Sequence, residues 1–345
     1  MVRLRITSTP VITSFSFAAM FFLGLGVAIV GAAARNAGIP ATEVGLLLTT
    51  QHLGFFLSVA FAGSLADRYS KPIILALGSV AMAVGFGGFY LWGSFFLNAF
   101  FMFCLGVGIG VNEGVADALL LDLHPVRKSL FINLNHFFTT LGSLLITGYL
   151  IFLQMAWRLS MNQAAIAVAI LALLFAVSRE KRSSGDKRRS SRRAEQHEQH
   201  AGSGPSPTDA GSIRGLLRSP SVLLMGVAMI FAVGMELGSI GILTTYLMEL
   251  RDFTQLTSKL GLLLFIGGFG FGRVVLGALI RDGQEWRWLL GCFAASVVTM
   301  TLLYAVTAGP LLYLFAFAAG LSVSVLLPTM IAFAGKQFSE HAGTV

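Results

Sequence analysis

The amino-acid sequence predicts an all-α membrane protein, on the basis of its composition, the length of its apolar blocks and the placement of its charges. Hydrophobic residues make up 55% of the 345 residues and charged residues 12%, whereas about 25% of a soluble domain is charged. A helix that crosses the hydrocarbon of a bilayer needs about 20 mostly apolar residues. Ten blocks qualify, and because they lack the alternating pattern of barrel strands, we expect helices at residues 11–34, 44–66, 72–92, 95–121, 127–153, 161–178, 219–248, 256–280, 287–307 and 310–335.

The positive charges indicate how these helices are oriented. Ten of the 24 Lys and Arg residues lie in the segment 179–218. When successive helices alternate in direction, the residues on the opposite side are only Arg35, Arg158, Arg251 and Lys259. Because cytoplasmic loops carry an excess of Lys and Arg, we expect a multi-pass protein of the cytoplasmic membrane with its N terminus in the cytoplasm. This asymmetry explains the formal charge of +8, so we expect no nucleic-acid partner.

No pattern of an enzyme or of a metal site occurs in the sequence. There is no phosphate-binding loop, no metal-ligand spacing of Cys and His, and no nucleophile with a base at a recognisable spacing. Cys104 and Cys292 each lie in an apolar run, which favours packing over a disulfide. The first apolar block is longer than the core of a secretory signal, which spans about 7 to 15 residues. We therefore expect no catalysis and no bound cofactor or metal.

A polar segment divides the chain into two parts that resemble each other. Residues 179–218 contain almost no large apolar side chain, so we expect a basic cytoplasmic linker that is disordered or weakly helical. It separates an N-terminal bundle of six helices, residues 1–178, from a C-terminal bundle of four helices, residues 219–345. Residues 44–67 and 260–282 both pass from a Gly-Leu-Leu-Leu start to a charged turn. Such duplication is typical of transporters that bind a ligand between two related halves.

The loop between the second and third blocks carries a motif. Residues 63–72 read Gly-Ser-Leu-Ala-Asp-Arg-Tyr-Ser-Lys-Pro. This loop resembles the signature G-x-L-A-D-R-x-G-R-K of the major facilitator superfamily. The resemblance implies the two-bundle fold of that family, normally with twelve helices, so we expect a truncated chain or a fragment in which the last two helices are missing. It also implies a cytoplasmic gate that includes Gly63, Asp67, Arg68 and Lys71.

Acidic residues inside the fourth block mark the centre of the predicted site. Glu113 and Asp117 lie one helical turn apart, so their carboxylates share one face, with Asn112 beside them. A charged side chain in hydrocarbon costs at least about 2.5 kcal/mol, so such residues face a bundle interior or a water-filled cavity. Two acids this close are expected to hold one proton between them, which predicts a proton-coupling site at Glu113 and Asp117. The structural alternative for either acid is a hydrogen bond to a neighbouring helix.

Further polar side chains lie at comparable depth in other blocks. The fifth block carries a polar stripe too broad for contact with lipid, and its His136 could relay protons near neutral pH or donate a hydrogen bond between helices. Glu236 lies near the middle of the seventh block, where it could contact a substrate or pair with Arg273 of the eighth block. The candidate substrate-binding residues are Asn112, Asn133, Asn135, His136, Gln51, His52 and Glu236.

The fourth and fifth blocks support a narrower resemblance. Residues 106–118, with their pattern G-x-G-x-x-E, and residues 133–138 are similar to the fourth and fifth helices of the fucose:proton symporter branch of that superfamily. In this branch the glutamate of the fourth helix is linked to proton coupling and sugar transport, and it corresponds to Glu113. The branch has asparagine where this chain has Asp117. It also has an acid in its first helix, whereas residues 11–34 contain none.

These patterns predict proton-coupled secondary transport of a sugar or similar small polar metabolite by alternating access, with the proton as the coupling ion. Proton-driven efflux of amphipathic drugs or metabolites is an alternative, favoured by the 29 Phe residues. A non-transporting membrane receptor or scaffold is the alternative from another class. We expect a small-molecule substrate, a surrounding lipid bilayer and a monomer.

Overall fold

The fold was determined as a computed structural model, which describes residues 6–124, 128–152, 156–178, 220–280 and 283–337. Several predictions concern residues outside this part, namely the linker 179–218, residues 338–345, the side chains of Asp67, Arg68 and Asn133, and the surroundings of Gly63. Within it, ten helical stretches are long and apolar enough to cross a membrane. The predicted all-α fold with ten membrane-spanning helices is confirmed.

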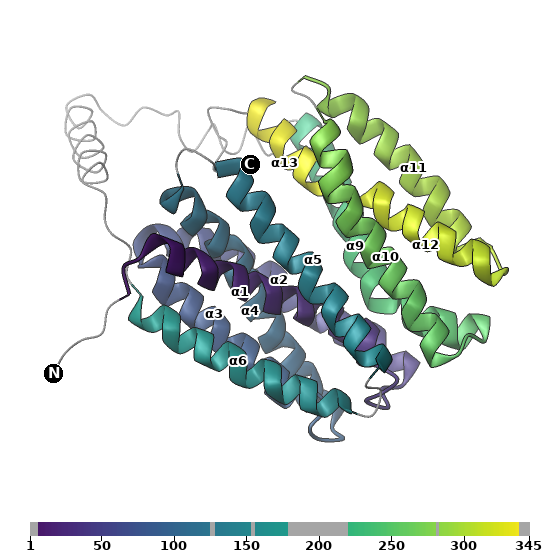
Figure 1. Cartoon of the computed structure of the whole chain (residues 1–345), viewed down its shortest axis with the longest axis horizontal. Coiled ribbons are helices and arrows are strands. Elements are labelled where there is room, and N and C mark those ends of the chain that lie inside the picture. Colours follow the sequence, from purple (N-terminus) through teal and green to yellow (C-terminus); the bar gives the residue numbers. More distant parts are fainter. Residues whose placement is uncertain (1–5, 125–127, 153–155, 179–219, 281–282, 338–345) are drawn as a thin grey trace.

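The helices form two groups that lie side by side (Figure 1). The first group contains α1 (Thr9–Ala33), α2 (Ala41–Arg68), α3 (Lys71–Gly88), α4 (Phe95–Leu123), α5 (Lys128–Phe152) and α6 (Trp157–Val177). The second contains α9 (Pro220–Arg251), α10 (Gln255–Leu279), α11 (Glu285–Ala305), α12 (Gly309–Val323) and α13 (Leu326–Gln337). The groups meet where α5 packs on α10 and α1 packs on α9.

The same helix pairing recurs in both groups. In the first group α2 and α3 pack on α4, and in the second α10 and α11 pack on α12. Glycine permits these contacts, because small residues let the backbones of neighbouring helices touch. A Cβ atom added to Gly106 of α4 would lie 1.9 Å from the carbonyl oxygen of Gln51 in α2, and one added to Gly268 of α10 would lie 2.1 Å from that of Phe317 in α12.

The last apolar block consists of two helices. Helix α12 ends at Val323 and α13 begins at Leu326, with a turn between them. Pro328 explains this break, because proline lacks the N–H that would bond to the carbonyl of Ser324 and its ring collides with that carbonyl. The block predicted as one helix over 310–335 is therefore interrupted by a turn at residues 324–325.

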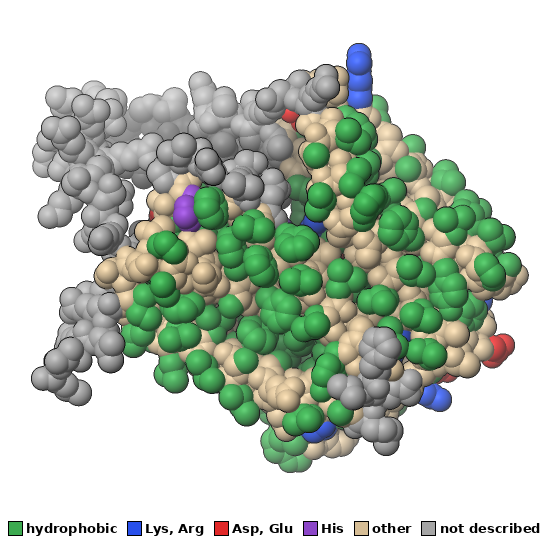
Figure 2. Space-filling model, in the orientation of Figure 1, with side chains coloured by type: hydrophobic (Ala, Val, Ile, Leu, Met, Phe, Trp, Pro, Cys, Tyr) green, Lys and Arg blue, Asp and Glu red, His purple; other side chains and the backbone are tan. Residues whose placement is uncertain are grey.

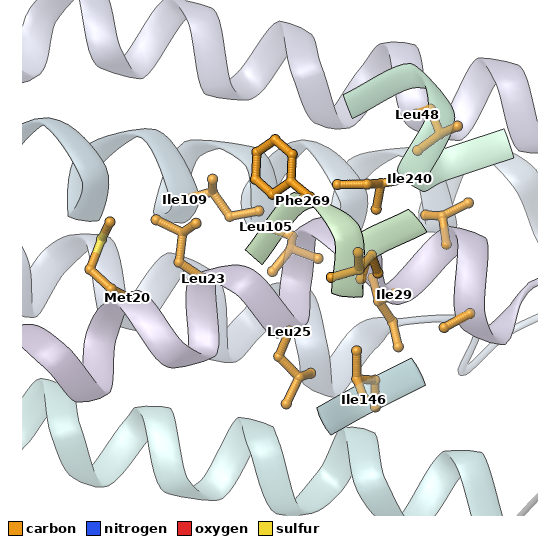
Figure 3. Packing of buried hydrophobic residues seen from close by; sticks show 14 of the residues in the cluster. Met20, Leu23, Leu25, Ile29, Leu48, Leu105, Ile109, Ile146, Ile240 and Phe269 are labelled. Atoms are coloured by element: carbon orange, nitrogen blue, oxygen red, sulfur yellow. The ribbon is translucent and has the colours of Figure 1, made fainter. Parts of the chain in front are cut away.

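The packed interior continues from one group into the other, and many large apolar side chains are exposed on the helices. Figure 3 shows Ile240 of α9 and Phe269 of α10 among the buried residues of the first group, including Ile29 and Leu105. Figure 2 shows many hydrophobic side chains spread over one face, with few charged side chains among them. We name the two ends of the molecule by residues. The Lys71 end is where α1 begins and α2 ends, and the Asn36 end is where α1 ends and α2 begins.

Candidate functional site

Charged and amide side chains from four helices meet where the two groups touch. We call this set the buried cluster, and it comprises Glu113 and Asp117 of α4, Asn135 and His136 of α5, Glu236 of α9 and Arg273 of α10. Asp117 and Arg273 each lie six residues before the end of their helix, which is about 9 Å at 1.5 Å per residue. The cluster therefore lies between the middle of the helices and the Lys71 end.

Asp117 is held by two donors from α5. The Asn135 Nδ2 atom donates to Asp117 Oδ1 at 2.8 Å, and His136 Nε2 lies 2.9 Å from Asp117 Oδ2. Asn135 is fully buried, and the side chains of Asp117 and His136 are 27% and 28% exposed. Hydrogen bonds to a carboxylate offset much of the cost of burying it. The structure thus brings together three residues that the sequence marked in separate helices.

Arg273 connects the two groups. One guanidinium nitrogen lies 3.4 Å from Glu236 Oε1, and another donates to the backbone carbonyl of His136 at 3.4 Å. The guanidinium carbon also lies 4.2 Å from the centre of the Phe269 ring, a cation–π distance. Glu236 therefore pairs with Arg273, which is the alternative to substrate contact that the sequence left open for this acid. The same arginine contacts the first group through α5.

Glu113 has a different environment from the other two acids. Its carboxylate accepts no hydrogen bond from any described residue, although it lies within electrostatic range of His136, Asp117, Glu236 and Arg273. Among the described residues of the cluster, three carboxylates face one arginine and one histidine. The cluster can therefore accept positive charge, and Glu113 is the carboxylate that has no hydrogen-bond donor among the described residues.

Polar atoms without partners surround the cluster. The Oδ1 atom of Asn135, the Oγ1 atom of Thr139 and the Nε atom of Arg273 are buried and form no hydrogen bond with a described residue. A buried polar atom left unpaired costs about 1–3 kcal/mol. A water molecule or hydroxylated ligand that bonds to these atoms recovers this free energy, so they can contribute to ligand binding.

Three other predicted binding residues lie apart from this cluster. Asn112 is fully buried, and its Nδ2 atom donates to the Gly108 carbonyl at 2.8 Å and to Met82 Sδ of α3 at 3.3 Å. Gln51 Nε2 donates to the Gly26 carbonyl of α1, and His52 Nδ1 lies 2.7 Å from the Leu48 carbonyl of its own helix. These contacts join helices of the first group or lie within one helix, so they are structural in this conformation.

Lys71, a member of the predicted gate, also pairs within the first group. Its Nζ atom lies 2.6 Å from Asp122 Oδ2, which joins the beginning of α3 to the end of α4. The Asp122 side chain is 60% exposed, and exposed ion pairs contribute little to stability. The predicted gate between the two halves is not formed by this contact.

Two residues that contribute to the site were not among the site residues predicted from the sequence. Arg273 was assigned only a pairing role, yet it also contacts the first group through the His136 carbonyl. Phe269 was missed, and it lies one helical turn before Arg273, where its ring can cover the guanidinium. A general rule could have found Arg273, because an ionisable residue inside a spanning helix marks a functional site by default.

Comparisons with known proteins identify the family. Residues 11–345 match the sequence profile of the Major Facilitator Superfamily. The chain is 25% identical over 142 residues to YwtG of Bacillus subtilis, named as a metabolite transport protein, with 40% of this chain and 31% of that protein covered. It is 27% identical over 175 residues to the multidrug resistance protein MdtL of Shewanella oneidensis, with 48% and 44% covered. The chain therefore spans less than half the length of either curated relative.

Solved structures share the fold at low sequence identity. A D-xylose-proton symporter superposes with a TM-score of 0.63 at 13% identity, covering 94% of this chain and 82% of that one. The inward-open xylose transporter XylE of E. coli superposes with a TM-score of 0.67 at 13% identity, covering 97% and 85%. The sequence profile covers nearly the whole chain, and the superposition agrees with it. The chain belongs to the Major Facilitator Superfamily, a family of transporters and not of enzymes.

Proposed function

We propose that this chain belongs to a proton-coupled secondary transporter that moves a small organic solute across the cytoplasmic membrane by alternating access. The observation that carries this proposal is the buried cluster, because its charged side chains come from both helix groups and meet at one place. A site shared by two groups changes its contacts when the groups move relative to each other. Such a site is where binding can be coupled to movement.

Proton coupling follows from the excess of carboxylates in the cluster. Glu113 has neighbouring charges but no hydrogen-bond donor among the described residues, so a proton on its carboxylate removes an uncompensated charge from a poorly hydrated site. Asp117 lies one turn away and is bonded to His136, which can pass a proton on near neutral pH. We assign proton binding to Glu113 and the modulation of that binding to Asp117.

A sugar or similar small polar metabolite is the first candidate substrate. The unpaired polar atoms of Asn135, Thr139 and Arg273 suit a ligand whose hydroxyl groups both donate and accept hydrogen bonds. The resemblance of α4 and α5 to the fucose:proton symporter branch supports the same substrate class, as does the similarity to YwtG. We assign substrate contacts to Asn135, His136, Glu236 and Arg273. Gln51, His52 and Asn112 are candidates in a different conformation, and Asn133 remains a candidate whose side chain lies outside the described part of the structure.

Efflux of an amphipathic compound is the second candidate, and two observations favour it. The chain is similar to MdtL, and two aromatic side chains lie close in sequence to members of the cluster. The ring of Phe269 covers the Arg273 guanidinium, and Phe138, three residues after Asn135 in α5, stacks on Phe17 of α1 with ring centres 4.9 Å apart. An amphipathic cation would contact both the rings and the carboxylates.

The orientation and organisation of the protein are part of the proposal. We place the Lys71 end and the N terminus in the cytoplasm, because the basic segment 179–218 connects helices at that end. The two helix groups are then the two bundles of the transporter, residues 1–178 and 219–345, and we propose that the protein works as a monomer.

A substrate screen on the full-length protein tests this function. The protein is reconstituted in lipid vesicles that contain a pH-sensitive dye, and sugars, polar metabolites and lipophilic cations are added in turn. We expect at least one class of compound to cross the vesicle membrane and to change the internal pH as it does so. If only sugars change the internal pH, the result supports uptake of a polar metabolite. If only lipophilic cations change it, the result supports efflux. If each class binds and none moves across the membrane, the protein is a receptor or scaffold and the proposal is wrong.

A further inference from the structure

A fully buried lysine lies at the Asn36 end, in the first turns of α10. The Lys259 side chain is 0% exposed, and it forms no ion pair with any carboxylate in the described part of the chain. Lysine is almost never fully buried unless it is paired with an opposite charge. Nothing in the proposed proton or substrate site uses this residue, so its burial needs a separate explanation.

The partners of Lys259 come from the other helix group. Its Nζ atom donates to Asn36 Oδ1 at 2.6 Å and to the Leu150 carbonyl of α5 at 3.0 Å. Gln255, one turn earlier in α10, donates from Nε2 to the same Asn36 oxygen at 2.7 Å. Two side chains of the second group therefore bind one amide oxygen and one carbonyl of the first group.

The end of α5 supplies the negative charge that a carboxylate would otherwise supply. Leu150 is among the last four residues of α5, and the carbonyls of these residues have no partner within the helix. A helix C terminus carries a partial negative charge that stabilises a nearby cation. Lys259 thus caps α5 from outside its own group, which explains how a buried ammonium is tolerated there.

The helices around this contact pack closely against each other. A Cβ atom added to Gly31 of α1 would lie 2.0 Å from the Ile240 carbonyl oxygen of α9. Among the described residues, the ion pair between the groups at this end joins Arg35 and Glu249 at 3.7 Å, with side chains 62% and 49% exposed. An exposed ion pair of this kind contributes little to stability. We therefore expect the buried hydrogen bonds of Lys259 to stabilise the closed state of this end more than the Arg35–Glu249 pair does.

We propose that Lys259 is a positioning residue that locks the Asn36 ends of the two helix groups together. The lock rests on the proposed function only in that alternating access requires this end to open. Opening breaks both hydrogen bonds and moves the ammonium into water, so Lys259 sets the balance between the closed and open states. The lysine touches neither the proton nor the substrate.

Labelling of a buried cysteine tests this lock on the full-length protein in lipid vesicles. Thr244 of α9 is 3% exposed and lies one turn beyond Ile240 and Gly241, on the face that meets the first group. Thr244→Cys is placed in a background with serine at both native cysteines, and a membrane-impermeant maleimide is added on the Asn36 side. Because a hydrogen bond to a charged group contributes about 1.5–3 kcal/mol, we expect Lys259→Met to raise the labelling rate about tenfold or more.

Two further variants separate the lock from a general loss of stability. Asn36→Asp creates an ion pair with Lys259, so we expect slower labelling than in the parent protein. Arg35→Gln removes the exposed pair at the same end and should leave the rate unchanged. Unchanged labelling in both Lys259→Met and Asn36→Asp, with both proteins folded, overturns the lock. If labelling shifts as expected but no solute is transported, the lock stands and the proposed transport function fails.

Discussion

The three acids of the buried cluster differ in how each negative charge is balanced. Asp117 has two donors from α5, and Glu236 has Arg273. Glu113 has charged neighbours but no hydrogen-bond donor among the described residues. Because a buried charge without a partner is costly, these environments indicate two roles. Asp117 and Glu236 order the cluster, and Glu113 remains available for a proton.

The Arg273–Glu236 pair can be tested with a double-mutant cycle. Glu236→Gln or Arg273→Met alone leaves one charge without its partner, so each should lower the melting temperature of the purified protein. The double variant should be more stable than the sum of the single effects implies, by a coupling free energy of about 0.5–3 kcal/mol. Strictly additive losses would show that the two charges do not stabilise each other.

His124 should make the stability of the protein depend on pH. Its Nε2 atom lies 2.7 Å from Thr13 Oγ1, and its ring stacks on Phe131. Burial lowers the pKa of His124, so below about pH 6.5 the unfolded chain binds a proton that the folded chain does not. The stability contributed by this residue is complete above that pH and is lost as the pH falls through the lowered pKa.

The measurement is the melting temperature at pH 7.5 and pH 5.0. The melting temperature of the wild-type protein should fall further on acidification than that of His124→Gln, since the other histidines are the same in both proteins. Equal losses in the two proteins would show that His124 does not titrate as described.

At the scale of helices, the lengths of the apolar blocks predicted the membrane-spanning helices well. The direction in which each polar side chain points was harder to predict. Asn112 was grouped with Glu113, yet consecutive residues of a helix point about 100° apart, and Asn112 faces α3 instead. Asp117 was predicted to couple protons, and Asn135 and His136 to bind substrate. The three side chains meet in hydrogen bonds between α4 and α5, which is the structural alternative that the sequence left open for Asp117 and His136. The contacts of Arg273 and Lys259 with the opposite group could not be predicted, because they depend on how the two groups are placed.

Two neighbouring glycines of α10 test the close packing of α10 on α12. A Cβ atom at position 268 would lie 2.1 Å from the Phe317 carbonyl oxygen, whereas one at 267 would meet no described atom within 4 Å. Overpacking costs about 1–3 kcal/mol, so Gly268→Ala should lower the melting temperature. Gly267→Ala is the matched control and should not lower it. Equal effects of the two substitutions would mean that the helices do not approach this closely.

For the whole molecule, the charge distribution predicts the orientation. Ser70 and Ser94 are both exposed residues that precede a helix and make no side-chain cap, the first at the Lys71 end and the second at the Asn36 end. In cells whose membrane is intact, an impermeant maleimide should label Ser94→Cys and leave Ser70→Cys unlabelled until the membrane is opened. The reverse pattern would place the Lys71 end outside and contradict the orientation.

The central claim is that the carboxylate of Glu113 carries the transported proton, and internal pH reports on it most directly. Vesicles that contain the full-length protein and a pH-sensitive dye receive a substrate found in the screen, with wild-type and Glu113→Gln protein compared at equal amounts. We expect the wild-type protein to change the internal pH as substrate moves, and Glu113→Gln to abolish this change while substrate still binds. An undiminished pH change in Glu113→Gln would contradict the account.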